Sequence, residues 1–299
     1  MCVIFDIAKL IYAEVAGSNK AELNGCNLFS DEYSTQDKYN KIQTLFKRND
    51  EPGIVRIPIQ GNTIQQFLRA SVMAKNAGLD IIACLDSYEN HSSMMNRLMT
   101  IKSSAGYVKY IELFNELPHM IDLYPGDKIR SLTELLDKTN NYSVWAKSNI
   151  PGVKTITMAP YNSMDERSWP KHWDGVTNTE ILEKLIKYTS TDIAAIHLYG
   201  DSFGKKLQLS TLGSNISKWN KSTTKKKKIW VTECGEEFWS GHIGYYNKIV
   251  KLMRNLVDID KVIWYRQCIK TSSEQDNGYA LEALDTGKQS ELFKLLEQN

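Results

Sequence analysis

The chain has 299 residues, of which 42% are hydrophobic, and its 37 basic and 35 acidic side chains leave a formal net charge of +2. The apolar fraction is large enough to bury a full core, which excludes a globally disordered chain. The near balance of charge argues against nucleic acid as a partner. No stretch approaches the ~18 consecutive apolar residues of a membrane helix, so we expect no membrane partner either.

The N-terminal segment has the pattern of an amphipathic helix. Apolar side chains recur at helical spacing from Val3 to Ile11, and charged residues occupy the other side. Because Asp6 and Lys9 interrupt the apolar stretch and no basic region precedes it, the segment does not resemble an export signal. We therefore expect a cytoplasmic protein as the sequence is written, or a secreted one if a leader has been removed.

Short β-branched or aromatic runs alternate with helix-like stretches along the rest of the chain. Parallel strands need a crossover between them, so this alternation predicts a parallel sheet. The predicted strands are Leu23–Phe29, Gly53–Ile59, Leu79–Leu85, Tyr107–Asn115, Val153–Pro160, Asp192–Tyr199, Lys228–Cys234 and Lys261–Gln267. The predicted helices include Ile64–Ala77, Leu132–Lys147, Thr179–Thr189, Tyr245–Val257 and Glu291–Glu297.

Eight such units in a chain of this length fit a (β/α)8 barrel. A doubly wound open sheet is the alternative, but the Gly-rich phosphate turn that follows its first strand is missing. The predicted fold class is therefore α/β, a single (β/α)8 barrel with an extra N-terminal helix. No linker, repeat or change of composition divides residues 1–299, which we expect to form one domain. The lysine-rich stretch Ser222–Lys228 precedes a strand and is expected to be a solvated loop at the N-terminal face.

The cysteines and histidines show no disulfide or metal-binding pattern. The cysteines are odd in number, form no CxxC pair and lie mostly in or beside apolar runs, which favours buried, reduced thiols. No HExxH or similar ligand spacing occurs. We therefore expect no metal and no other cofactor. The residues considered are Cys2, Cys26, Cys84, Cys234 and Cys268, together with His91, His119, His172 and His242.

Two glutamates lie at the ends of predicted strands, Glu116 at the fourth and Glu233 at the seventh. Active sites of (β/α)8 barrels lie at the C-terminal strand ends, so we expect these carboxyl groups to face each other across the barrel mouth. Retaining glycoside hydrolysis needs two carboxyl groups ~5–5.5 Å apart, one protonated and one ionised. Unequal neighbours such as Arg56 would split their pKa values. Glu112 is in phase with Glu116 and is expected to be a buried structural acid.

These residues lie in motifs that resemble the clan A glycoside hydrolases, which are retaining enzymes on a (β/α)8 barrel. Residues 112–116 (ELFNE) resemble the clan's E-x-W-N-E strand, and residues 229–235 (IWVTECG) its W-x-T-E-x-G strand. Residues 195–200 (AIHLYG) and 55–58 (VRIP) resemble the H-x-Y-G and V-R-x-P strands. The similarity is nearest to family 5 cellulases and mannanases and to family 128 endo-β-1,3-glucanases. One departure is that Leu117 separates Glu116 from the proline that usually follows it.

The resemblance implies a role for each matching residue. Glu116 would be the acid/base, Glu233 the nucleophile, and Asn115 a hydrogen-bond partner of the sugar hydroxyl next to the reacting carbon. Trp264 would stack beneath the sugar ring. The other residues implied to bind or orient the substrate or the nucleophile are Arg56, His197 and Tyr199. Tyr161 and Trp239, with Trp169 and Trp173, are candidate sugar platforms or packing lids in the loops.

Each of these residues also has a plain structural interpretation. A strand-end glutamate can simply be solvated, Arg56 can form a surface ion pair, and His197 or Trp264 can belong to the core. We expect a monomeric retaining glycosidase acting on an oligo- or polysaccharide, of endo-β-glucanase or β-mannanase type. A catalytically silent carbohydrate-binding barrel, favoured by the inserted Leu117, is the alternative. An enzyme of phosphorylated metabolites would need a Gly-rich phosphate cup that the sequence lacks.

Overall fold

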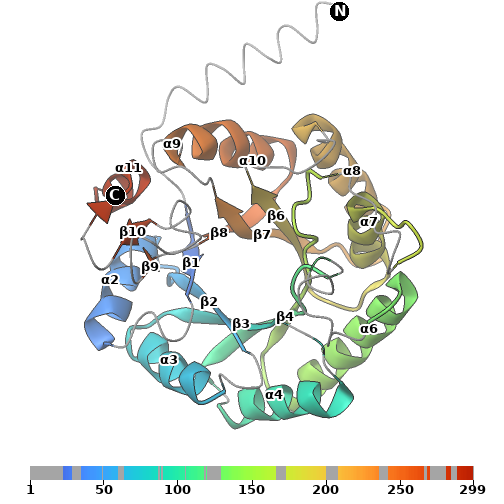
Figure 1. The fold of residues 1–299 in the computed structure, drawn as a ribbon, viewed down its shortest axis with the longest axis horizontal. Coiled ribbons are helices and arrows are strands. Elements are labelled where there is room, and N and C mark those ends of the chain that lie inside the picture. The colour runs from blue at the N-terminus through green and yellow to red at the C-terminus, as the bar shows by residue number, and fades with distance from the viewer. Residues whose placement is uncertain are drawn as a thin grey trace, which may run out of the picture.

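The computed structural model describes residues 23–28, 35–48, 50–59, 64–86, 88, 90–104, 106–117, 119, 129–165, 173–199, 208–235, 242–265, 268–269, 281–283 and 288–298. Eight parallel strands close into a barrel in chain order, β1 to β8. Helices form a ring around the barrel (Figure 1). The predicted (β/α)8 fold is confirmed, whereas the predicted N-terminal helix lies outside the described residues.

The strands lie close to the predicted ranges. They are β1 (Gly25–Asn27), β2 (Ile54–Pro58), β3 (Asp80–Leu85), β4 (Val108–Leu113), β5 (Lys154–Thr157), β6 (Ile193–Tyr199), β7 (Lys228–Gly235) and β8 (Ile259–Trp264). A small sheet that the sequence did not predict follows, formed by β9 (Cys268–Ile269), β10 (Glu282–Ala283) and β11 (Lys288–Gln289).

The helices fill the crossovers between the strands. They are α2 (Gln36–Phe46), α3 (Ile64–Asn76), α4 (His91–Ser103), α6 (Leu132–Asn149), α7 (Asn178–Tyr188), α8 (Leu209–Lys221), α9 (His242–Tyr245), α10 (Leu252–Leu256) and α11 (Glu291–Glu297). The predicted helix over Tyr245–Val257 is interrupted by a π-helical segment, η3 (Tyr246–Lys251). No helix among the described residues is long and apolar enough to cross a bilayer.

Strand alternation divides the apolar side chains into two layers. One cluster fills the barrel interior, and a larger one lies between the barrel wall and the helices. Side chains on a strand alternate between its two faces. Where this alternation is regular, the residues two and four positions after a member of the interior cluster therefore also point into the barrel. The interior cluster consists of Ile54, Ile82, Ile156, Ala159, Ile193, Ala195, Trp230 and Ile263.

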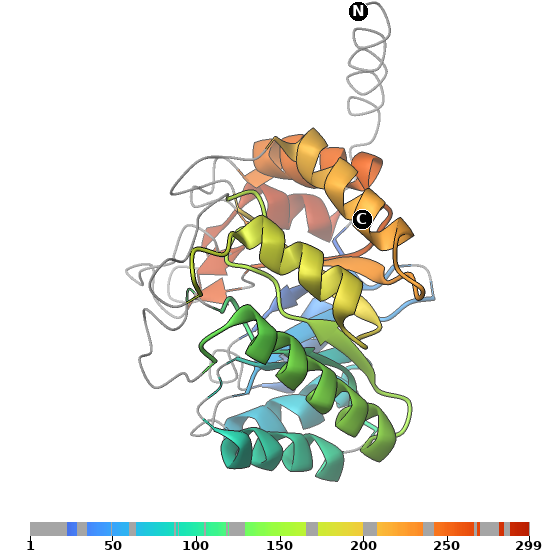
Figure 2. The same cartoon turned by 90° about the vertical axis from the view of Figure 1, so that its right-hand side faces the viewer.

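The helices are held at their ends and against one another. Thr177 and Glu180 form a capping box that begins α7 by satisfying free backbone N–H groups. The last helix, α11, lies beside α2 (Figure 1), where the ammonium group of Lys41 sits 4.6 Å from the ring centroid of Phe293. This contact joins the two ends of the ring of helices. The side view shows the helices packed around the outside of the strands (Figure 2).

The lysine-rich stretch lies immediately before β7, and Lys225, Lys226 and Lys228 are exposed as predicted. Lys227 differs, because its side chain is buried and donates hydrogen bonds to the carbonyls of Thr189 and Thr191. Burial and the nearby Lys225 lower the pKa of Lys227 to about 8. Cys26, Cys84 and Cys234 are buried, as predicted.

Candidate active site

Arg56 organises the floor of the barrel mouth. It lies two residues after the interior residue Ile54 on β2, so its side chain also points inward, and it is 2% exposed. Its Nε donates to Oε2 of Glu112 at 2.5 Å and its Nη2 to Oδ1 of Asn115 at 2.8 Å, while Nη1 donates to the carboxylate of Glu233. One guanidinium therefore ties the ends of β4 and β7 to the middle of β2.

A β-bulge turns Glu233 toward the cavity. Trp230 and Thr232 point into the barrel, so strict alternation would send Glu233 outward. The pairing of β7 with β6 shifts by one residue here, leaving Thr232 without a partner on β6 and placing His197 opposite Glu233. Bulges re-aim side chains in this way beside active sites. The bulge thus lets two consecutive residues, Thr232 and Glu233, reach the interior.

At the end of β4, a strained turn brings two consecutive side chains to the barrel mouth, as the bulge does in β7. Phe114 and Glu116 have φ values of 73° and 51°, in the left-handed region that bulky residues rarely adopt. The ring of Phe114 packs edge-on against Tyr88 and Tyr142, at 6.0 Å and 6.2 Å between centroids. This packing stabilises the turn, which presents both Asn115 and Glu116 to the cavity.

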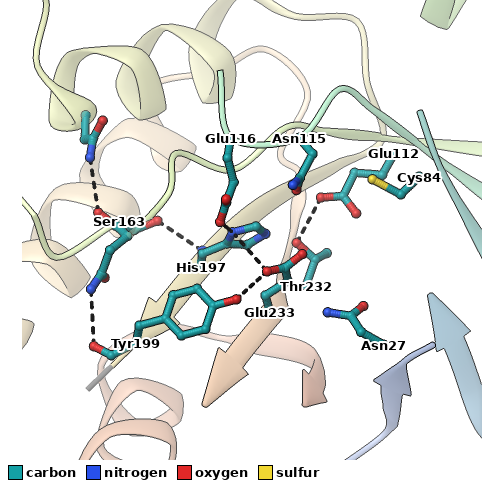
Figure 3. Close-up of polar contacts among 12 residues, drawn as sticks. Asn27, Cys84, Glu112, Asn115, Glu116, Ser163, His197, Tyr199, Thr232 and Glu233 are labelled. Atoms are coloured by element: carbon teal, nitrogen blue, oxygen red, sulfur yellow. Dashed lines mark hydrogen bonds and ion pairs between the residues drawn. The ribbon is translucent and has the colours of Figure 1, made fainter. Parts of the chain in front are cut away.

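The two predicted catalytic glutamates come together at one place, as Figure 3 shows. A carboxyl oxygen of Glu116 and one of Glu233 lie within 4.8 Å of each other. Glu116 is 8% exposed, and burial, together with the charge of Glu233, raises its pKa well above the ordinary value despite the opposing effect of Arg56. Glu116 is therefore the carboxyl group that holds its proton.

Glu233 has different surroundings. It accepts hydrogen bonds from the guanidinium of Arg56 and from the hydroxyl of Tyr199. Two donors, one of them cationic, thus hold this carboxyl group in place. Burial and the charge of Glu233 raise the pKa of Tyr199 well above its usual range, so the phenol remains a donor. The site therefore places a carboxyl group that holds its proton, Glu116, beside one that is hydrogen-bonded to a cation, Glu233.

His197 links the two carboxyl groups. Its Nδ1 lies 2.7 Å from Oε1 of Glu116 and 3.8 Å from Oε2 of Glu233 (Figure 3). Burial, and then the charge of Arg56, lower the pKa of His197 well below its usual value, so the ring is neutral. A neutral imidazole can share one proton with Glu116 without adding charge to the site.

The loop after β5 holds the end of β6 in place. The backbone N–H of Ser163 donates to the carbonyl of His197 at 2.9 Å, and the N–H of His197 donates to Oγ of Ser163 at 3.1 Å. The amide of Asn162 donates to the carbonyl of Tyr199 at 3.2 Å. This loop therefore fixes the two β6 residues that contact the glutamates.

Aromatic side chains continue from the glutamates toward the rim. Tyr161, a predicted sugar platform, stacks on Tyr199 with 6.0 Å between centroids and lies 4.4 Å from the ring of His119. Tyr265 meets the edge of Tyr199 at 6.1 Å. Such rings offer flat apolar surfaces of the kind that sugar C–H faces cover.

The structure corrects the prediction for Trp264. Its side chain is fully buried in the layer between barrel and helix, 5.0 Å from the ring of His242 and 6.1 Å from that of Tyr245 on α9. The interior residue on β8 is Ile263, so Trp264 faces outward and the next residue, Tyr265, points into the cavity. Trp264 is a core residue and cannot stack beneath a sugar.

Other residues at the site were missed or lie elsewhere. Trp239 and Trp169 are outside the described residues, and Trp173 is 1% exposed and cannot serve as an open platform. The structure adds residues that polar or aromatic character at an inward strand position could have indicated. They are Asn27, Cys84, Thr232 and Tyr265.

Glu116, His197 and Glu233 also form a group whose ligand atoms all lie within 4.8 Å, close enough to hold a metal ion. The contact between Glu116 and His197 has the length of a hydrogen bond, 2.7 Å. Glu116 and His197 are therefore paired with each other, and Glu233 is paired with Arg56 and Tyr199.

Comparisons with solved structures find the same fold in glycosidases. β-Glycosidase BGL167 matches with a TM-score of 0.64 and 11% identity over 93% of this chain and 96% of that one. The endo-1,4-β-D-mannanase of Thermotoga petrophila RKU-1 matches at 0.58 and 12%, over 93% and 98%. The endo-β-1,4-glucanase Xac0029 of Xanthomonas axonopodis pv. citri matches at 0.59 and 14%, over 92% and 96%. At these identities the likeness shows the fold alone.

A family model settles the class of protein. The model described as the glycosyl hydrolase catalytic core matches residues 137–295, which is more than half of the chain and includes His197, Tyr199 and Glu233. No curated protein matches the sequence. The resemblance to the clan A glycoside hydrolases is confirmed at this level. The chain belongs to the glycosyl hydrolase catalytic core family and is a glycosidase.

Proposed function

We propose that this glycosidase is a retaining enzyme that cleaves a β-linked glycan, with Glu116 as acid/base and Glu233 as nucleophile. The observation that carries the proposal is that one carboxyl oxygen of Glu116 lies within 4.8 Å of one of Glu233. Retaining enzymes hold the two groups ~5–5.5 Å apart, whereas inverting enzymes need ~6.5–9.5 Å to admit a water molecule. The distance supports direct attack by one carboxylate.

In the first step, an oxygen of Glu233 bonds to the anomeric carbon as the bond to the leaving oxygen breaks, and Glu116 gives its proton to that oxygen. In the second step, water attacks the same carbon, Glu116 takes the proton from the water, and the bond to Glu233 breaks. Asn115 supports both steps. Because its Oδ1 accepts from Arg56, its amino group is left to donate to a sugar hydroxyl.

The proposed substrate is an oligo- or polysaccharide of the β-glucan or β-mannan class, cut within the chain. The likeness to an endo-mannanase and an endo-glucanase supports this class. So do the aromatic rings of His119, Tyr161 and Tyr265 around Tyr199, because aromatic surfaces of this kind suit the C–H faces of sugars.

The inserted Leu117 does not remove Glu116 from the cavity. Leu117 is fully buried in the apolar core, and Glu116 still contacts His197. This arrangement favours catalysis over the alternative of a silent carbohydrate-binding barrel.

The test uses two glutamate variants and two leaving groups. Glu233→Gln should lose hydrolysis of both an activated aryl β-glycoside and the natural glycan. Glu116→Gln should keep the first step on the aryl substrate, whose leaving group needs no proton, and so release one equivalent of the leaving group in a burst. It should then turn over slowly, because no base activates the water of the second step, and it should lose the glycan. Glu183→Gln, on the outer helix α7, is the matched control and should behave as wild type. A 2-deoxy-2-fluoro glycoside should leave a covalent adduct on Glu233 that mass spectrometry detects. Turnover by Glu233→Gln, or binding without turnover by the wild type, would refute the proposal.

A further inference from the structure

Glu112 is a fully buried carboxyl group that the two-glutamate reaction does not use. Its Oε2 accepts from Nε of Arg56 at 2.5 Å, and its Oε1 accepts from the hydroxyl of Thr232 at 3.1 Å. Both oxygens therefore accept a hydrogen bond, and one of the two donors is a permanent cation, which favours the ionised form. Although burial raises the pKa of Glu112, the adjacent guanidinium opposes that effect. The geometry is that of a charged carboxylate.

The position of Glu112 decides where the rest of Arg56 points. The guanidinium is planar and its donors have a fixed geometry. With Nε held by Glu112, Nη1 is directed at Glu233 and Nη2 at Asn115, the two groups proposed to touch the reacting sugar. Without an acceptor at Nε, the guanidinium loses one of the contacts that fix its plane, and its contacts with Glu233 and Asn115 are held less firmly.

The charge of Glu112 also reaches the proposed acid. The groups that act on Glu116 through their charge are Glu233, Asp86 and Glu112, which raise its pKa, and Arg56, which lowers it. His197 contacts Glu116 but is neutral. The charge of Glu112 thus adds to burial and to the charge of Glu233, which favour the protonated form of Glu116 more strongly, and it opposes the effect of Arg56.

We propose that Glu112 is a positioning residue of this glycosidase: it holds Nε of Arg56, and thereby the contacts of Arg56 with Glu233 and Asn115, and places a negative charge beside the site. This inference rests on the proposed roles of Glu116 and Glu233. It goes beyond them because it gives a part in the reaction, including its pH dependence, to a residue that never meets the substrate.

Three variants separate charge from packing. Glu112→Gln keeps the shape and a hydrogen-bond acceptor but removes the charge. Glu112→Asp keeps the charge on a shorter side chain. Thr232→Val is the matched control, because it removes the other hydrogen bond to the same carboxylate and leaves the charge in place.

The readouts are the pH profile of kcat/KM on an aryl β-glycoside whose leaving group needs protonation, and the titration of the Glu116 carboxyl by carbon-13 NMR, assigned with Glu116→Gln. For Glu112→Gln we expect the basic limb and the Glu116 titration to move to lower pH. We also expect kcat to fall about tenfold or more, the size that supporting residues around a site typically show, with KM nearly unchanged. Glu112→Asp and Thr232→Val should keep the basic limb near its wild-type position.

A Glu116 titration that is the same in Glu112→Gln and wild type would overturn the inference, as would an equal displacement in Thr232→Val. The NMR titration needs no substrate, so it judges the role of Glu112 even if the wild type fails to hydrolyse the aryl glycoside. That failure would count against the proposed function instead.

Discussion

Replacing Arg56 with lysine should damage both the stability and the activity of this glycosidase, although it conserves the charge. The guanidinium reaches Glu112, Glu233 and Asn115 with three different nitrogen atoms, and it is 2% exposed. A lysine ammonium is a single point on a flexible stem and cannot span the three groups. The ammonium group can contact one of the two carboxylates, and the hydrogen bonds to the other carboxylate and to Asn115 are lost.

The loss can be worked out from these contacts. A hydrogen bond that involves a charged group contributes about 1.5–3 kcal/mol, so losing two of them amounts to about 3–6 kcal/mol. This range agrees with the cost of breaking a buried ion pair, which is about 3–5 kcal/mol. At about 2–4 °C per kcal/mol, Arg56→Lys should lower Tm by about 10 °C. The contact with Asn115 alone corresponds to about a ten- to hundredfold fall in kcat/KM, at about 1.4 kcal/mol for each factor of ten.

Thermal unfolding and steady-state hydrolysis of an aryl β-glycoside measure the two effects. Arg69→Lys on the exposed face of α3 is the matched control, and its stability should stay within about 0.5 kcal/mol of wild type. If Arg56→Lys unfolds within about 2 °C of the wild type and keeps its kcat/KM, the guanidinium does not organise the site and the reasoning fails.

Further predictions address the barrel wall, the rim and the acid. A Cβ on Gly25 would lie 2.0 Å from the backbone oxygen of Ile54. Gly25→Ala should therefore lower the free energy of unfolding, measured by denaturant titration, by about 3 kcal/mol or more. Gly244→Ala is the control and should not lower it, because the space around Gly244 is open. Trp264→Ala should lower the free energy of unfolding by about 3–5 kcal/mol, because it empties a core position. Tyr265→Ala should weaken oligosaccharide binding with little change in Tm. The opposite pair of results would show that Trp264, and not Tyr265, contacts the sugar. The raised pKa of Glu116 means that its favourable effect on folding is present in acid and is lost as pH rises through that pKa. Glu116→Gln should therefore have a higher Tm than wild type at neutral and alkaline pH and lose this advantage in acid; an advantage that is independent of pH would contradict the assignment.

Much of the fold could be predicted because its signals are local. The alternation of β-branched runs with helical periods identified all eight strands. The polar residues at the strand ends indicated candidate site residues that the structure brings together, namely Arg56, Asn115, Glu116, His197, Tyr199 and Glu233. Glu112 was also correctly predicted to be a buried acid, from its phase relative to Glu116. These features depend on neighbouring residues along the chain, which a sequence displays directly.

The sequence by itself determined which residues end the strands, and only the tertiary structure decided which way they face. Strict alternation from Trp230 would turn Glu233 out of the barrel, and the bulge at Thr232 turns it in. At the end of β8, Trp264 faces the outer layer and contacts His242, and the next residue, Tyr265, contacts Tyr199 beside the glutamates. The physical reason is that side chains change face at every residue, while the register that selects the face is set by hydrogen bonds to a neighbouring strand far away in the chain.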